Sequence, residues 1–287
     1  MTSEQLSLPP PPPPSQYGLR VVARPKCASI GECISMHWSR LTKGDDSAHV
    51  ISTYYPLEPV LQDGPQCGIV ALSMAMQLLE CSGKACISVD KVLEEARTLK
   101  LTTKGELFSV ENMKVLAETV CGRCKAQVLS SSTTTPGQII SHLLQGRPLL
   151  VPYDSDSNFE PCLRNGQCAH WAVLHGFCMA VPEVHLMKDL LKDDERLERL
   201  HHLKPSTNCK AVVERLATDS CNIFVYAHQG KSVRCGVWSL EDLLASNCNL
   251  RQVTKKRDIS QFVLPEGGIE RGLATQMLLL RPLWDDC

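Results

Sequence analysis

Cys67 occupies a position in the sequence where a cysteine can act as a nucleophile. Cys67 follows the turn signal Gly64-Pro65 and opens an almost wholly apolar run that extends to Leu79. A helix without a polar face is normally buried, so the run predicts a central helix with Cys67 in its first turn. Unpaired N–H groups and the helix dipole favour an anion there, and they lower the pKa of a thiol from its free value of about 8.5. Two hypotheses follow: a thiolate nucleophile, or a buried structural cysteine.

A thiolate nucleophile needs a base that another part of the fold supplies. His170 is the candidate, because it opens the strand-like run 169–177 and follows a polar, glycine-bearing loop. Such a loop suits the wall of a cleft. The alternative is a strand-end histidine without a catalytic role. His175, five residues further along, would lie on the opposite side of an ideal strand and is interpreted as structural.

Acyl transfer also needs hydrogen-bond donors for the developing oxyanion. The backbone N–H of Cys67 is one donor. Gln62 stands five residues earlier, and the intervening turn can bring its side-chain amide back toward Cys67. Gln66 is adjacent to Cys67 and points away in most backbones. Gln62 is therefore the predicted second donor.

The order of periodic segments predicts an α+β fold, with a helical part first and an antiparallel sheet second. Residues 1–50 are interpreted as a proline-rich, largely disordered N-terminal segment, and residues 51–287 as the folded domain. Within that domain, residues 181–220 are charged and helical in pattern, which predicts a surface insertion. Helices are expected at 67–79, 89–100, 109–120, 138–145 and 238–244. Extended or strand-like runs are expected at 51–60, 147–153, 169–177, 222–228, 259–264 and 273–280.

Composition narrows the class of protein. The 287 residues carry 30 Lys and Arg against 31 Asp and Glu, so nothing indicates nucleic acid or an acidic membrane surface as a partner. No apolar run approaches the roughly 20 residues of a membrane span, and no secretory signal is visible. The 15 cysteines are irregularly spaced and odd in number. These features predict a soluble, cytoplasmic protein with reduced thiols and no cofactor.

The N-terminal segment contains an unbroken proline run, Pro9–Pro14. Because every φ is locked and no N–H is available, this run must form polyproline II. It is either a stiff tail or a docking peptide for an aromatic-lined groove of the SH3, WW or profilin type.

Several of these motifs together carry a resemblance. LEPVLQDGPQCG at 57–68, GRPLLV at 146–151 and HWAVLHG at 170–176 resemble papain-like peptidases of the C39-like group. With the proline-rich N-terminus, the chain looks more closely like the actin maturation protease family. The resemblance implies a cytosolic thiol aminopeptidase that removes the acetylated first residue, Met or Cys, of newly made actin. It also implies that the proline run binds profilin.

Carried onto this sequence, the resemblance makes Cys67 the nucleophile, His170 the base and Gln62 the oxyanion donor. The broader group usually has Asp or Asn at the end of the next strand, where this chain has Gln229. The Gln229 amide oxygen could orient the imidazole, with Asn247 as a second choice, or the site could run as a dyad. The acidic substrate would favour nearby cations, for which the candidates are Arg147, Arg164, Lys231 and Arg234.

Two other classes of function compete with the enzyme. Cys121 and Cys124 form a single C-x-x-C, and Cys162, Cys168 and His170 could complete a zinc site with them. The protein would then be a zinc-stabilised module. The second rival is a catalytically inactive papain-like scaffold that uses its proline run as an adaptor for profilin.

Overall fold

The computed structural model describes residues 30–79, 87–181, 184–204, 213, 222–252 and 259–283. The proline run Pro9–Pro14 lies outside these residues, and so does the docking hypothesis built on it.

Helices begin where the sequence offers a capping side chain. The hydroxyls of Ser88, Ser109 and Thr135 each accept a backbone N–H three residues ahead, which satisfies one of the unpaired donors of a first turn. The described helices are α1 (Ile30–Thr42), α2 (Cys67–Leu79), α3 (Val89–Thr98), α4 (Val110–Cys121), α5 (Pro136–Leu144), α7 (Leu240–Cys248) and α8 (Gly268–Leu273), with the 3-10 helices η1 (His185–Leu190) and η2 (Ile259–Gln261).

One mainly antiparallel sheet runs through the described part of the chain. Its order is β2-β9-β3-β4-β1-β6-β5, and β7 pairs with both β4 and β8. Only the β1–β6 pair is parallel among the pairs described. The strands are β1 (His49–Tyr54), β2 (Cys124–Ser130), β3 (Leu149–Asp154), β4 (Ala169–Val181), β5 (Leu191–Asp193), β6 (Leu200–Leu203), β7 (Ile223–His228), β8 (Gly236–Ser239) and β9 (Gln276–Pro282).

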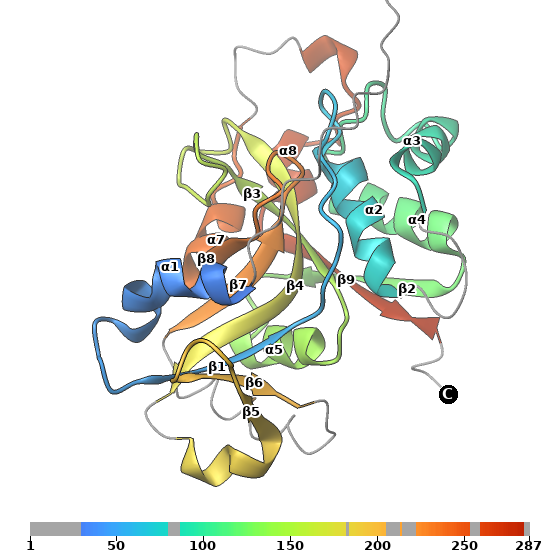
Figure 1. Cartoon of the computed structure of the whole chain (residues 1–287). Helices are drawn as coiled ribbons and strands as arrows, with labels where there is room; N and C mark the ends of the chain where they lie inside the picture. Colours follow the sequence, from blue (N-terminus) through green and yellow to red (C-terminus); the bar gives the residue numbers. More distant parts are fainter. Residues whose placement is uncertain are drawn as a thin grey trace, which may run out of the picture.

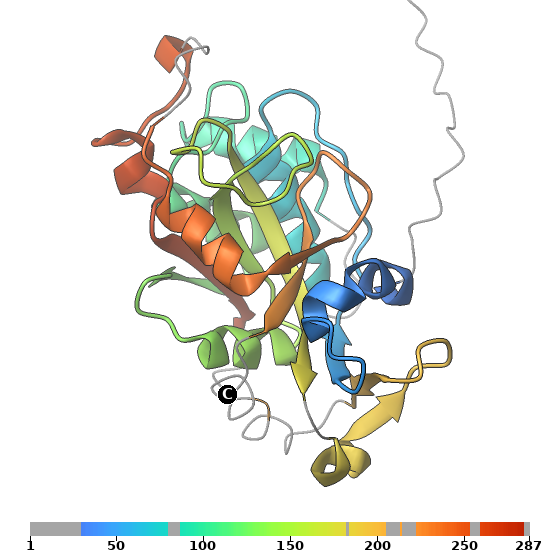
Figure 2. The ribbon, with the colours of Figure 1, turned by 90° about the vertical axis from the view of Figure 1, so that its left-hand side faces the viewer.

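Strand β4 separates two apolar cores, because successive side chains of a strand point to opposite faces. Trp171 and Val173 pack with α2, α3 and α4, whereas Ala172 and Leu174 pack with α5 and α7. Figure 1 shows α2, α3 and α4 on one side of β4 and α7 and α1 on the other, and Figure 2 shows the same layers turned by 90°. Fully burying a Val or Leu side chain contributes about 1.5–3 kcal/mol, so the sheet is held from both faces.

The predicted α+β class is confirmed, and the predicted helices at 67–79, 89–100, 109–120 and 138–145 are found within two residues at each end. Three expectations are wrong. Helix α1 and the start of β1 lie inside the segment 1–50 that was expected to be largely disordered. Residues 184–204 form η1, β5 and β6 rather than a helical insertion, because β6 pairs with β1 and extends the sheet. Residues 259–264 contain η2 instead of a strand.

The N-terminus of α2 lies very close to β4. A Cβ atom built on Gly68 would come within 3.0 Å of the Met113 side chain and 3.1 Å of the Leu107 and Trp171 side chains. A glycine is therefore what lets the first turn of α2 approach the strand, and this approach brings Cys67 to the start of β4.

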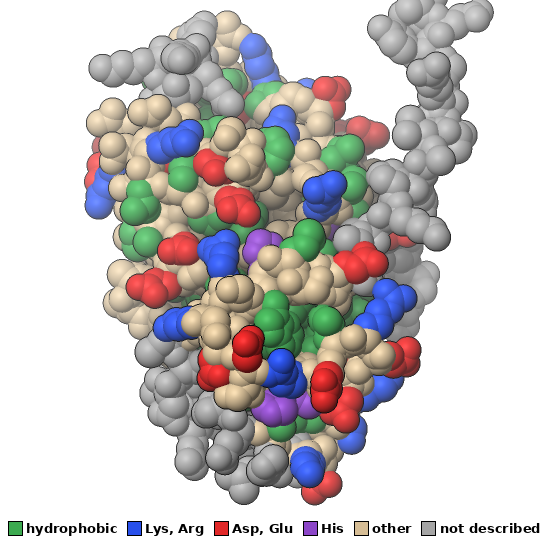
Figure 3. Space-filling model, turned by 60° about the vertical axis from the view of Figure 1, so that its left-hand side comes forward, with side chains coloured by type: hydrophobic (Ala, Val, Ile, Leu, Met, Phe, Trp, Pro, Cys, Tyr) green, Lys and Arg blue, Asp and Glu red, His purple; other side chains and the backbone are tan. Residues whose placement is uncertain are grey.

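The surface agrees with the balanced composition. Figure 3 shows Lys and Arg interspersed with Asp and Glu over one face of the molecule, without a broad patch of one sign. Among the residues that the structure describes, no helix combines the length and the apolar character that crossing a membrane would require.

Candidate active site

Cys67 is the first residue of α2, directly after the predicted turn. Gly64 has a φ of +64°, a left-handed conformation that favours glycine. The Gln62 side-chain amide donates a hydrogen bond of 2.6 Å to the Gly64 carbonyl, which fixes the turn. The half-buried thiol of Cys67 thus lies at the positive end of a helix whose remaining residues are almost all buried.

The thiol is paired with the imidazole of His170, the second residue of β4. Burial alone would raise the pKa of the Cys67 thiol, but the positive charge of His170, its ring hydrogen bond and the N–H groups of Trp171 and Gly68 lower this pKa below its ordinary value. Burial alone would lower the pKa of His170, but the Cys67 thiolate and hydrogen bonds to Cys67 and Gln229 raise it. The opposite shifts are those of a thiolate–imidazolium pair.

A main-chain carbonyl orients the imidazole. Nε2 of His170 donates a hydrogen bond of 2.7 Å to the Gln229 carbonyl oxygen, so Nδ1 is the nitrogen left to face Cys67. The Gln229 amide oxygen accepts the Lys231 N–H at 2.7 Å. The prediction named only this amide oxygen as the group that holds the ring; the structure adds the Gln229 carbonyl, which makes the 2.7 Å contact, and the Gln229 side chain also bonds the imidazole. Asn247 does not orient the imidazole. Its side chain accepts a hydrogen bond from Ser131 and donates to the carbonyls of Pro152, Leu273 and Gln276.

This geometry predicts a small effect for Gln229→Ala. The substitution keeps the carbonyl and removes only the side chain, whose net contribution is that of about one hydrogen bond, roughly 1 kcal/mol. We expect kcat/KM for peptide cleavage to fall by less than about tenfold. A loss near the roughly 10⁴-fold seen when an orienting side chain is replaced would instead assign the orienting role to the Gln229 side chain.

The loop that leads into His170 is held by a buried carboxylate. Asp154, the last residue of β3, is fully buried, and its side chain accepts the N–H groups of Arg164 at 2.6 Å, Gly166 at 2.9 Å and Cys168 at 3.1 Å. Hydrogen bonds to a charged acceptor contribute about 1.5–3 kcal/mol each. Asp154 therefore fixes the polar loop that the sequence placed at the wall of a cleft.

A pocket of about 400 Å³ opens beside the pair, and Cys67 and His170 both line it. Much of its wall is apolar and comes from Leu107, Phe108, Phe159, Phe262 and Leu273.

Glu106, which is 2% exposed, holds one segment of the pocket wall, residues 103–106, in place. Its carboxylate accepts the N–H groups of Thr103 at 2.9 Å, Lys104 at 2.7 Å and Val263 at 3.0 Å. Burial would raise the pKa of Glu106, but these backbone hydrogen bonds lower it. The Glu106 carboxylate therefore links residues 103–106 to Val263 through these hydrogen bonds.

Gln62 also lines the pocket, with its main-chain N–H bonded to the Gly230 carbonyl at 2.7 Å. Its amide nitrogen carries two hydrogens, one of which is donated to Gly64. Its Oε1 is buried without a hydrogen-bond partner. The structure therefore brings the amide to the same pocket as Cys67 and His170.

Comparisons with known proteins agree with this arrangement. A family model described as actin maturation protease-like, C-terminal domain, matches residues 57–178. The actin maturation protease of Danio rerio is 37% identical over 235 residues, which cover 80% of this chain and 74% of that protein. That of Xenopus tropicalis is 33% identical over 260 residues, covering 89% and 81%. The chain belongs to the actin maturation protease family.

The human member of this family is 36% identical over 235 residues, which cover 80% of this chain and 65% of that protein. A solved structure titled as a putative C39-like peptidase from Bacillus anthracis is similar at 10% identity and a TM-score of 0.37, covering 79% of this chain and 98% of that one. This superposition is too loose to bear on function.

For this member of the actin maturation protease family, the structure shows which of the remaining candidate residues lie near the Cys67–His170 pair. Among the four cations suggested for an acidic substrate, Lys231 lines the pocket, and Arg147 lines a separate hollow beside α5. The zinc set that combined the C-x-x-C pair with Cys162, Cys168 and His170 does not assemble. Within the described residues, the group of three or more potential ligands that converges is His175, His228 and Cys235.

Two features of the site in this family member were not predicted from its sequence: the orienting carbonyl of Gln229 and the buried carboxylate of Asp154. The Gln229 carbonyl has no side-chain signature, so a search for Asp or Asn could not find it. Asp154 is an acidic residue at the end of a strand-like apolar run, and this position was a signal in the sequence. A carboxylate at that position must be satisfied by donors, and the following loop supplies three.

Proposed function

We propose that this chain is a cytoplasmic cysteine aminopeptidase that removes the N-acetylated first residue, Met or Cys, of newly made actin. The product would be the mature, acidic actin N-terminus. The observation that carries the proposal is the Cys67–His170 pair at the wall of an apolar pocket. Membership of a family whose named relatives are actin maturation proteases supports the substrate.

The proposed chemistry assigns one step to each residue of the site. The Cys67 thiolate attacks the carbonyl carbon of the first residue, and the carbonyl oxygen takes the negative charge. The Cys67 N–H and the free hydrogen of the Gln62 amide stabilise that charge. His170 then gives its proton to the leaving amine, which is the new actin N-terminus. Water, deprotonated by His170, hydrolyses the acyl-enzyme and restores the thiolate.

The pocket suits a blocked first residue. An acetylated residue has no ammonium group, so the site needs no free carboxylate to bind one. Glu106, the buried acid of the pocket wall, already accepts three N–H groups. The apolar side chains around it offer contacts to a Met or Cys side chain and to the acetyl methyl. An exopeptidase that takes one capped residue is therefore supported better than one that selects a free amine.

Lys231 is proposed to meet the acidic residues beyond the cut. Its side chain is exposed at the pocket, where one cation–carboxylate contact contributes up to about 1 kcal/mol. Lys231→Glu is expected to raise KM for an acetyl-Met-Asp-Asp peptide by about tenfold, because attraction becomes repulsion, while acetyl-Met-Ala-Ala changes little. Arg234→Glu is the matched control, since it makes the same charge change in the same loop but does not line the pocket. Equal effects of the two substitutions would contradict a local contact.

Gln62→Ala tests the oxyanion role. Removing one preorganised donor costs about 10²–10³ in kcat, and we expect a loss in that range with little change in KM. Gln66→Ala is the control, because Gln66 packs on Gly105 and does not line the pocket. If kcat of Gln62→Ala stays within a fewfold of that of the unsubstituted chain, the Gln62 amide only stabilises the turn at Gly64.

One experiment tests the proposed function as a whole. Acetyl-Met-Asp-Asp and acetyl-Cys-Asp-Asp peptides are incubated with the full chain and with its Cys67→Ala form, and mass spectrometry follows loss of the first residue. Cleavage by the first protein alone is the expected result. No cleavage of either peptide, or of actin itself, would reject the aminopeptidase.

The proline run is proposed to bind profilin and so to bring profilin-bound actin to the site. Calorimetry of profilin with the full chain, and with a chain in which Pro9–Pro14 are replaced by Gly and Ser, tests this partner. Binding to the first chain alone is expected. Profilin binding by a chain that cleaves nothing would support the inactive adaptor.

A further inference from the structure

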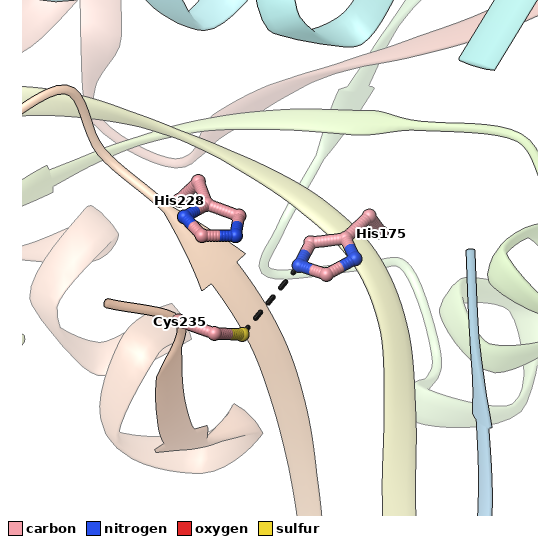
Figure 4. Close-up of side chains that lie close together, drawn as sticks. All are labelled: His175, His228 and Cys235. Carbon is pink, nitrogen blue, oxygen red and sulfur yellow. Dashed lines mark hydrogen bonds between the residues drawn. The ribbon is translucent and has the colours of Figure 1, made fainter. Parts of the chain in front are cut away.

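Three buried or half-buried side chains converge away from the catalytic pair. They are His175 on β4, His228 at the end of β7 and Cys235 just before β8, and Figure 4 shows them turned toward one another. One ligand atom from each lies within 4.8 Å of the others. Cys235 Sγ and His175 Nε2 are 3.6 Å apart. Two ligands of a tetrahedral zinc ion with bonds of about 2.0–2.3 Å lie roughly 3.5 Å apart.

The backbone fixes His175 in the form that a metal needs. His175 lies where the register between β4 and β7 shifts, an irregularity that re-aims a side chain. Its Nδ1–H donates to the Tyr55 carbonyl at 2.9 Å, and the Tyr55 N–H donates back to the His175 carbonyl at 2.9 Å. Nε2 is therefore the unprotonated nitrogen, and it faces Cys235. A backbone carbonyl on the second ring nitrogen is the usual outer partner of a metal-binding histidine.

His228 supplies the second imidazole. It is 3% exposed, and its Nδ1 is buried without a hydrogen-bond partner, which is a costly arrangement for a polar atom. Its ring stacks on His175 with 5.1 Å between centroids. Burial lowers the pKa of both rings, of His175 to about 3 and of His228 to about 4.

We propose that His175, His228 and Cys235 bind a zinc ion, with water in the fourth position. One thiolate and two neutral imidazoles suit this borderline-soft cation better than calcium or magnesium, which prefer oxygen. Cys235 is half-buried in the partly exposed loop 229–235, which gives the ion a way in. The site is distinct from Cys67, but His228 directly precedes Gln229, whose carbonyl orients His170. A bound ion would therefore anchor the strand end that positions the catalytic ring.

The test uses the full chain carrying Cys67→Ala, because Cys67 with His170 is itself a pair that can take zinc. Metal content after purification without chelator is expected to be one zinc per chain. Added Co²⁺, in chelator-treated protein, is expected to give a thiolate-to-cobalt charge-transfer band. Cys235→Ala and His228→Gln should each abolish both signals. Cys124→Ala is the matched control, since it removes a cysteine of the C-x-x-C pair and should change neither.

A second readout does not depend on the folding of further variants. Zinc is expected to protect Cys235, but not the exposed Cys168, from alkylation when the modified cysteines are mapped by mass spectrometry. The proposal is overturned if the chain neither retains zinc nor gives the cobalt band, in which case the three side chains are only a buried hydrogen-bonded group. It is equally overturned if zinc leaves Cys235 unprotected, or if Cys124→Ala removes the ion.

Discussion

Replacing Cys67 with alanine is expected to reduce peptide cleavage by at least about 10⁴-fold, the order of loss found when a nucleophile is removed from a hydrolase. In the proposed mechanism the sulfur forms the covalent bond to substrate, and the described pocket wall offers one thiol paired with an imidazole, that of Cys67. The rate is measured with the acetylated peptides by single-turnover kinetics. KM or peptide affinity should change little, because the pocket walls remain.

The control for this substitution is Cys162→Ala. Burial raises the pKa of the Cys162 thiol to about 11, so this cysteine is protonated at neutral pH and is not a nucleophile. Its loss is expected to leave kcat within a fewfold of the unsubstituted chain. If Cys67→Ala retains more than a hundredth of the activity while its thermal midpoint is unchanged, the nucleophile is another group.

Replacing His170 with alanine is the second large change, with an expected loss of about 10³–10⁴-fold or more in kcat. Two functions disappear together. The thiol loses the positive charge and the hydrogen bond that lower its pKa, and the leaving amine loses its proton donor. His202→Ala is the control, because His202 lies on β6 and pairs with Asp194 at 2.9 Å. Its substitution should leave kcat unchanged.

A structural role for His170 would give a different result. The His170 ring meets the Tyr153 ring edge-on, with 5.9 Å between centroids. If His170 only filled this space, His170→Gln would keep the activity that His170→Ala loses. Under the proposed chemistry glutamine cannot accept or give the proton, and both variants stay inactive. Partial recovery of His170→Ala by added imidazole would mark the loss as chemical rather than structural.

The elements that place the catalytic pair were readable from the sequence because each carries a strong local signal. The apolar run after Cys67 is long, and the strand-like run that starts at residue 169 is rich in aromatic and branched residues. Helix α1 was missed although Ile30, Ile34, Trp38 and Leu41 recur at helical spacing. Strand β2 was missed although Cys124 and Ala126 alternate with exposed neighbours.

Other features could not be read locally. Whether residues 181–220 form helix or strand is decided by pairing with β1, which lies some 150 residues earlier in the chain. The orienting carbonyl of Gln229 is a backbone atom that any residue supplies. The convergence of His175, His228 and Cys235 depends on a register shift in β4, and an ideal strand gives no sign of it. Tertiary context, rather than local propensity, determines these features.

The central claim is that the Cys67 thiol is ionised by its imidazole partner, and the pH dependence of its alkylation tests this most directly. The pKa of Cys67 is lowered and that of His170 is raised, so both shifts favour the charged forms of the pair. Iodoacetamide should therefore label Cys67 rapidly through neutral pH, with a midpoint below the roughly 8.5 of a free thiol. In His170→Ala the midpoint should move up to or above that value. A labelling rate that rises only near 8.5 in the unsubstituted chain, and that His170→Ala does not shift, would contradict the account.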